Sequence, residues 1–236
     1  MPRVRPAAAT TPGTLLALMQ LSSPALPVGG FSYSEGLEPA VEAGLVSGEA
    51  QAGDWLLDQL HLALARADLP AVANGCAAWR RHDLRAVHAL NDWVHATRET
   101  AELRQQTSQM GRSLTDWLAN SAQRADPRIV QLAALTPAPS WPVAFALAGV
   151  LAGAQARETA LAFAFGWAEN MVQAAMKAVP LGQAAAQRML ARLSQAIPAV
   201  VDAALVQPAA TRQAYSPGLA ILSAQHETQY SRLFRS

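Results

Sequence analysis

The sequence has 236 residues, with 18 lysines and arginines against 17 aspartates and glutamates, so its formal net charge is +1. A chain of this length can bury a sizeable core without disulfides or metals, and its one cysteine excludes an internal disulfide framework. The balanced charge argues against a general nucleic-acid-binding protein, which needs a basic surface to neutralise phosphates. Because it has no partner for a disulfide within the chain, Cys76 is expected to be a small buried side chain.

The N-terminal segment, about residues 1–11, contains arginines but lacks the apolar run that follows them in a signal peptide. The longest apolar stretch, residues 143–151, is much shorter than the roughly 20 residues that a membrane span needs. We therefore expect a cytoplasmic protein with a flexible N-terminus and no membrane association.

Alanine and leucine dominate the sequence, and period-2 alternation is scarce, which predicts an all-α fold. Three stretches place apolar residues at helical spacing, from Trp55 to Leu64, from Leu161 to Ala175 and from Leu190 to Leu205. Each is expected to bury one face against neighbouring helices. No break separates two compositions, so we predict a single domain over residues 1–236, a bundle of roughly eight to ten helices.

Proline and glycine predict where these helices end. Pro198 is expected to kink or end the last long helix. The other predicted breaks and loops, in chain order, are residues 24–30, Leu69–Pro70, Asp126–Pro127, residues 136–142, residues 180–182 and residues 207–218.

No motif of a known catalytic or metal centre is present: the sequence has no Walker A loop, HExxH, CxxC or GxSxG. His88 and His95 lie seven residues apart, two helical turns, whereas a pair of metal ligands on a helix usually needs a spacing of three or four. The sequence therefore predicts no catalytic residue, no metal ligand and no cofactor.

The first of two unusual segments is LSSPALPVGGFSYSEGLE, near the N-terminus. Ser32 and Glu35 fit a capping box, so a helix is expected to begin there, and Pro39 must kink it or delay its start. Gly29 and Gly30 leave backbone amides accessible close to the helix, where they could bind an anion. The alternative is a simple joint between two helices.

The second unusual segment is the C-terminal ILSAQHETQYSRLFRS. It places Tyr230, Leu233 and Phe234 beside Arg232 and Arg235, residue types that are enriched at protein interfaces. Such a segment either packs on its own domain or stays exposed and becomes ordered on a partner. We expect the exposed, partner-binding form.

Two further features are charged. In TRETAELRQQTSQMGR, Arg98 and Glu102 have the spacing of an i,i+4 pair on a solvated helix face. Lys177 stands alone on an apolar helix close to Pro180. Its ammonium group either reaches water from the edge of the core or marks an interaction surface.

Together these segments resemble the urease accessory protein UreF family. The matching stretches are PALPVGGFSYSEGLEPAVEAGLV, TRETAELRQQTSQMGR, MKAVPLGQAAAQ and SAQHETQYSRLFRS, in the same order and over nearly the whole chain. The resemblance implies an all-α homodimer that binds a second accessory protein, UreD (also called UreH), and the GTPase UreG. It further implies that the assembly docks on apo-urease and promotes delivery of nickel to that partner.

The resemblance also implies three partner-binding surfaces. The tail matches the family segment that becomes ordered against UreD, the early loop lies near the dimer and partner surfaces, and the lysine motif is implicated in engaging UreG. The residues carried over are Gly29, Gly30, Tyr33 and Glu35 from the loop, Lys177, Pro180, Leu181, Gly182 and Gln183 from the lysine motif, and His226, Glu227, Thr228, Tyr230, Ser231, Arg232, Phe234 and Arg235 from the tail.

Four positions depart from the family pattern. Phe165, Gly166 and Trp167 stand where relatives often carry Tyr-Ser-Trp, Gln225 replaces a common arginine, and Pro39 stands where a helix-compatible residue is expected.

Three functional hypotheses follow. The first is a non-enzymatic adaptor for urease maturation. The second is a direct nickel-binding metallochaperone that uses His226 and other tail ligands, since imidazole suits nickel. The third is a helical protein that supplies an arginine, Arg98 or Arg104, to the nucleotide of UreG.

Overall fold

The structure, a computed structural model, describes residues 10–236. Most of the predicted flexible N-terminus, residues 1–9, lies outside the described residues. The described part is helical and contains no strand, so the prediction of an all-α bundle is confirmed. Its elements are α1 (Pro12–Ser22), η1 (Gly30–Ser32), α2 (Leu37–Glu42), α3 (Glu49–Gln59), η2 (Leu60–Asp68), α4 (Leu69–Arg80), α5 (Leu84–Ala96), α6 (Ala101–Ala119), α7 (Pro127–Ala133), α8 (Trp141–Leu151), α9 (Ala156–Ala178), α10 (Gln183–Leu205), η3 (Ala209–Thr211) and α11 (Pro217–His226).

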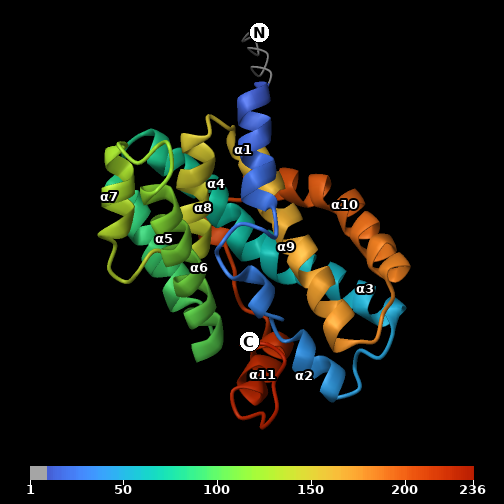
Figure 1. The fold of residues 1–236 in the computed structure, drawn as a ribbon. Helices are drawn as coiled ribbons and strands as arrows, with labels where there is room; N and C mark the ends of the chain where they lie inside the picture. The colour runs from blue at the N-terminus through green and yellow to red at the C-terminus, as the bar shows by residue number, and fades with distance from the viewer. Residues whose placement is uncertain (1–9) are drawn as a thin grey trace.

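Helices α4, α8 and α9 form the centre of the bundle, with α5, α6 and α7 on one side and α3 and α10 on the other (Figure 1). Helix α8 is apolar all round and buried from Pro142 to Gly149, as expected for a helix enclosed by others. The buried apolar residues form one contiguous cluster. Helix α9 carries this core down to the end of the molecule where α2, α11 and the C-terminus meet.

The three predicted apolar stripes lie in α3 and η2, in α9, and in α10, and they face the core. Phe165 is the exception, because its ring is 36% exposed on the outer side of α9. The predicted boundary at Asp126–Pro127 is also confirmed, since Asp126 caps α7 through the N–H of Arg128. Cys76 is buried as expected, and burial raises the pKa of its thiol to about 11.

The predicted break at Leu69–Pro70 is wrong, because the chain stays helical from α3 through α4. Pro70 has no N–H to donate, and its ring would crowd the carbonyl four residues earlier. That carbonyl belongs to Arg66, and it accepts instead from the N–H of Gln213, 3.1 Å away. The nine residues before α4 form the π-helix η2, which absorbs the irregularity. Pro198 likewise does not end α10, which continues to Leu205.

The predicted helix start at Ser32 is also wrong. Ser32 ends the short turn η1, and α2 begins only at Leu37, after Glu35 and Gly36 turn the chain with φ of +50° and +80°. The Glu35 carboxylate accepts from Gln106 and Trp167 and so forms no capping box with Ser32. Pro39 is the third residue of α2, a position whose N–H has no partner within a helix, which explains why it is tolerated.

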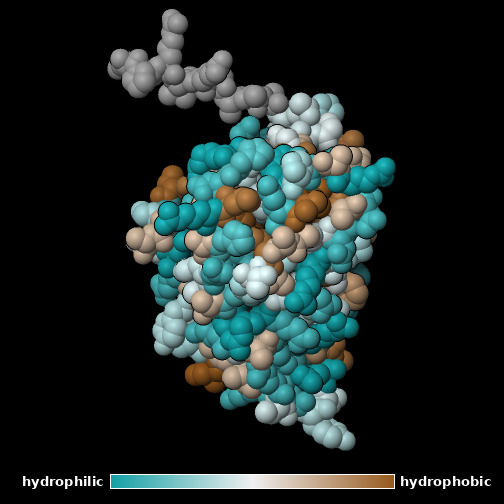
Figure 2. Space-filling view, turned by 90° about the vertical axis from the view of Figure 1, so that its left-hand side faces the viewer, coloured by the Kyte–Doolittle hydropathy of each residue, from teal (hydrophilic) through white to brown (hydrophobic). Residues whose placement is uncertain are grey.

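The face formed by the α5 and α7 side is mostly hydrophilic, with hydrophobic residues in small separate groups (Figure 2). Within residues 10–236, every helix is too short or too polar to cross a membrane.

Helix α6, which carries several side chains of the site described below, is held against the loop that precedes α8. Thr107 accepts from the N–H of Trp141 at 3.0 Å, and Gly111 faces the carbonyl of Pro139 so closely that a Cβ atom would lie 2.0 Å from its oxygen. The glycine thus permits the close approach of helix and loop.

Replacement of Gly111 by alanine is expected to destabilise the fold by about 2 kcal/mol, because the overpacking cost outweighs the gain in helix propensity. The measurement is urea unfolding. Gly218→Ala is the matched control, since a Cβ there would meet open space. Equal stability of the two variants would contradict the packing described here.

Candidate partner-docking site

The three segments predicted to bind partners, far apart in the sequence, meet around Lys177 in the last turn of α9. Its Nζ lies 5.8 Å from the centre of the Phe31 ring in the early loop and 5.7 Å from the centre of the Phe234 ring in the tail. A cation between two aromatic faces is attracted by both. The predicted surfaces therefore form one composite surface.

The C-terminal tail, residues 221–236, is packed on its own domain, so the expectation of an exposed segment is wrong in this structure. Phe234 and Ser236 are buried, as is His226 at the end of α11. The tail pairs with the early loop through its backbone: the N–H of Arg235 donates to the carbonyl of Ser32 at 2.8 Å. Ser34 donates to the carbonyl of Ser236 at 2.6 Å through both its N–H and its hydroxyl.

A buried carboxylate, Glu38 of α2, holds this tail. It accepts from the N–H groups of Leu233 at 2.7 Å and Phe234 at 2.9 Å. A carboxylate oxygen of Glu38 also lies 3.2 Å from Nε2 of His226, whose ring is fully buried. Hydrogen bonds to an ionised acceptor are stronger than neutral ones, so Glu38 is the main anchor of the tail.

A second buried carboxylate, Glu102 of α6, holds the other side of His226. Its Oε2 atom lies 2.7 Å from Nδ1 of His226, and Arg232 donates to its Oε1 at 2.8 Å. The predicted pair of Arg98 with Glu102 does not form, since Arg98 pairs instead with Asp68 at the end of η2. Helix α6 thus turns one of its acidic residues inward to the tail.

The start of α6 receives a further contact from the tail. Glu227 accepts from the N–H of Ala101 at 2.8 Å. A carboxylate at this end satisfies a free backbone donor and interacts favourably with the helix dipole. Thr100, which caps the helix, also hydrogen-bonds Ser223 of α11 at 2.8 Å.

Tyr33 links the early loop to α6. Its hydroxyl donates to Gln109 Oε1 at 2.8 Å, and Arg235 of the tail donates to the same oxygen at 3.3 Å. Burial raises the pKa of Tyr33, although the nearby Arg235 acts in the opposite direction. Gly30 lies close to α9, because a Cβ there would lie 2.7 Å from Nδ2 of Asn170.

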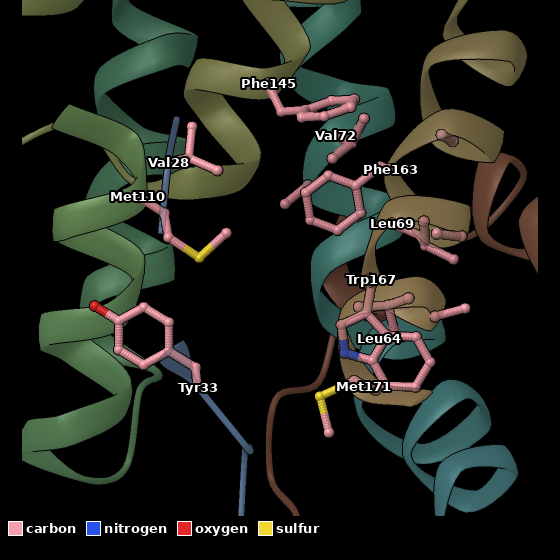
Figure 3. Close-up of a cluster of buried hydrophobic side chains, with 14 of the residues drawn as sticks. Val28, Tyr33, Leu64, Leu69, Val72, Met110, Phe145, Phe163, Trp167 and Met171 are labelled. Carbon is pink, nitrogen blue, oxygen red and sulfur yellow. The ribbon is translucent and has the colours of Figure 1, made fainter. Parts of the chain in front are cut away.

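Glu35 points into a cavity of about 100 Å³ that lies between α6 and α9. Figure 3 shows the apolar walls, with Tyr33 and Met110 on one side and Phe163 and Trp167 on the other. Gln106 and Trp167 donate to the Glu35 carboxylate at 2.6 and 2.9 Å. Burial raises the pKa of Glu35, and these two hydrogen bonds oppose the shift. The cavity was not predicted, because its walls come from distant parts of the sequence.

Several side chains of the composite surface remain open to solvent. Phe31 is 55% exposed, Leu233 is 69% exposed, and Tyr230 is fully exposed. The motif after Lys177 is exposed at Pro180, Gly182 and Gln183, and so are Arg232 and Arg235 of the tail. Sequence reasoning did not identify Phe31, Glu38, Glu102 or Gln109 as site residues, although all four stand within segments that it did single out.

No group of three or more histidine, cysteine, aspartate or glutamate residues within the described part of the chain has the arrangement of a metal site. Both ring nitrogens of His226 face carboxylates of the chain itself. The ring therefore offers no free nitrogen to a ligand while the tail is docked.

Fold and site together define an all-α protein with one composite surface of aromatic, apolar and basic side chains, the types that interfaces favour. The chain belongs to the UreF family, whose pattern matches residues 46–194, and the predicted resemblance is confirmed. It is 67% identical over the full length of both chains to the urease accessory protein UreF of Methylibium petroleiphilum. It is 59% identical to the protein of that name from a Polaromonas species, with 98% of each chain covered.

Another relative carries a second module. The bifunctional urease accessory protein UreEF of Bordetella bronchiseptica is 49% identical over 95% of the present chain, which corresponds to 52% of that longer protein.

The raised pKa of Glu35 predicts a pH dependence of stability. A carboxyl group that binds its proton more tightly in the folded state stabilises the fold at a pH below its pKa in the unfolded chain, which is near 4.5. This contribution is lost as the pH rises through the raised pKa of the folded state. In this window the stability of the wild type relative to Glu35→Gln should fall with a slope of at most about 1.4 kcal/mol per pH unit. Urea unfolding of both chains from pH 4 to 8 measures it. A constant difference would contradict the assignment.

Proposed function

We propose that the chain is a non-enzymatic, cytoplasmic adaptor for urease maturation, which links UreD and the GTPase UreG to apo-urease and promotes nickel delivery to that enzyme. Membership of the UreF family and the names of its relatives support the urease role. The observation that carries the adaptor role is the convergence of loop, lysine motif and tail on Lys177. One surface built from three segments suits a protein that must bring several partners into contact.

The exposed side chains suggest how this surface is divided. Tyr230 and Leu233 project from the docked tail and offer UreD an aromatic and an aliphatic anchor. Lys177 and the exposed motif from Pro180 to Gln183 offer UreG a cation beside a short loop. An adaptor of this kind couples the nucleotide state of UreG to nickel release by binding one conformer of the complex better than another.

Homodimerisation is part of the same proposal. Helix α1 exposes Leu15, Leu16 and Met19 by 53%, 65% and 59%, three large apolar side chains within two turns. A second copy of the chain would remove this apolar surface from water.

The two other hypotheses have less support. A nickel chaperone acting through His226 requires a free imidazole nitrogen, but that ring is buried between Glu38 and Glu102. An arginine supplied in trans requires a mobile, exposed guanidinium. Arg98 is held by Asp68, and Arg104 donates to the backbone of Arg98. The UreEF relative adds a link to UreE, because its name joins the two proteins in one chain.

Binding measurements with purified partners test the adaptor proposal. Tyr230→Ala is expected to weaken UreD binding at least tenfold, as loss of a tyrosine hot spot does. Lys177→Ala should weaken recruitment of UreG to a similar degree. The matched controls are Tyr215→Ala and Arg188→Ala, which remove an exposed tyrosine and an exposed cation elsewhere on the molecule.

The controls should bind as the wild type does. Unchanged affinity of Tyr230→Ala for UreD, or of Lys177→Ala for UreG, would overturn the assignment of that surface.

A further inference from the structure

The hydrogen-bond partners of the buried His226 ring indicate its protonation state. His226 has 0% exposure, its Nδ1 lies 2.7 Å from Glu102, and its Nε2 lies 3.2 Å from Glu38. A neutral imidazole has one N–H and one bare nitrogen. An ionised carboxylate can only accept hydrogen bonds, so two carboxylates on opposite sides of the ring require an N–H on each nitrogen.

The remaining contacts of Glu38 indicate that it is ionised. Its two oxygens accept from the backbone N–H groups of Leu233 and Phe234, and Gln229 donates at 3.4 Å. A protonated carboxyl would give up one of these acceptor positions. Hydrogen bonds to the charged form favour that form.

Glu102 is ionised for a different reason. It forms an ion pair with the guanidinium of Arg232 at 2.8 Å, and a protonated carboxyl would forfeit that attraction. The extra proton therefore resides on the ring of His226. Two carboxylates, one imidazolium and one guanidinium then balance, as burial requires.

The charged groups around His226 come from three directions. Glu38 faces it from α2 and Glu102 from α6, while Arg232 of the tail faces Glu102. Glu227, next to His226 in the chain, turns to the start of α6, where the N–H of Ala101 occupies it. The charge balance of this cluster is thus set by Glu38, Glu102 and Arg232, and it requires a positively charged His226.

We propose that docking of the tail takes up one proton at His226, which makes the tail a pH-sensitive latch over the early loop and Lys177. In the released tail the histidine lies in water, and an exposed imidazole is uncharged above neutral pH. Docking must then bind a proton from solution. The ratio of docked to released tail falls up to tenfold for each unit of rising pH in that range.

The latch goes beyond the proposed adaptor role, since it determines whether Phe234 lies against the ammonium group of Lys177. It is measured on the isolated chain. Its outcome is therefore independent of UreD and UreG binding, and failure of one proposal is distinguishable from failure of the other.

Nuclear magnetic resonance of the full chain labelled with ¹⁵N-histidine tests the protonation state directly. At pH 7 both ring nitrogens of His226, assigned by the loss of their signals in His226→Gln, should carry hydrogen. A ring with one bare nitrogen in the docked protein would overturn the proposal.

Hydrogen exchange of the Leu233 and Phe234 amides, corrected for intrinsic rates, tests the latch between pH 6 and 8.5. Their protection should fall by up to tenfold per pH unit in the wild type and show no such slope in His226→Gln. The matched control is His61→Gln, which removes an exposed histidine and should keep the wild-type slope. Protection that does not change with pH in the wild type would overturn the proposal.

Discussion

The carboxylate of Glu38 is the interaction on which the functional end of the molecule depends. It is almost fully buried, yet three donors from the tail surround it: two backbone N–H groups and the His226 ring. An unpaired buried donor costs about 1–3 kcal/mol. Loss of this one side chain would leave all three donors unpaired, so the docked tail and its anchor are interdependent.

By anchoring the tail, Glu38 brings it close to Lys177 and the early loop. With the tail held on α2, Phe234 reaches the ammonium group of Lys177, and the early loop contributes Phe31 from the other side. The tail also caps α6 through Glu227 and pairs with the loop at Ser32 and Ser34. The composite surface is thus assembled by contacts within one chain, while Tyr230 and Leu233 remain exposed on it.

Local pattern predicted much of the fold and little of the site's geometry. Helical spacing of apolar residues located η2, α9 and α10, because that periodicity reflects one buried face. The prediction of a break at Pro70 is wrong, because the Arg66 carbonyl, which cannot accept from Pro70, accepts from the N–H of Gln213 in a distant loop. The capping box predicted from Ser32 and Glu35 is also absent, because the Glu35 carboxylate accepts hydrogen bonds from α6 and α9 instead. Family resemblance supplied the three segments, but only long-range contacts bring them together around Lys177.

Lys177 is the only lysine in the chain, which makes the central claim directly measurable. Reductive methylation with ¹³C-formaldehyde places one side-chain reporter between the two rings, separable from the N-terminal amine. In the wild type, ring currents of Phe31 and Phe234 should move its resonance upfield from that of a free dimethyl-lysine, and Phe234→Leu should reduce the shift. If Glu38 holds the tail in place, Glu38→Gln will reduce the shift as much as Phe234→Leu does, with helicity retained. A resonance that stays in its wild-type position in Glu38→Gln would contradict the account.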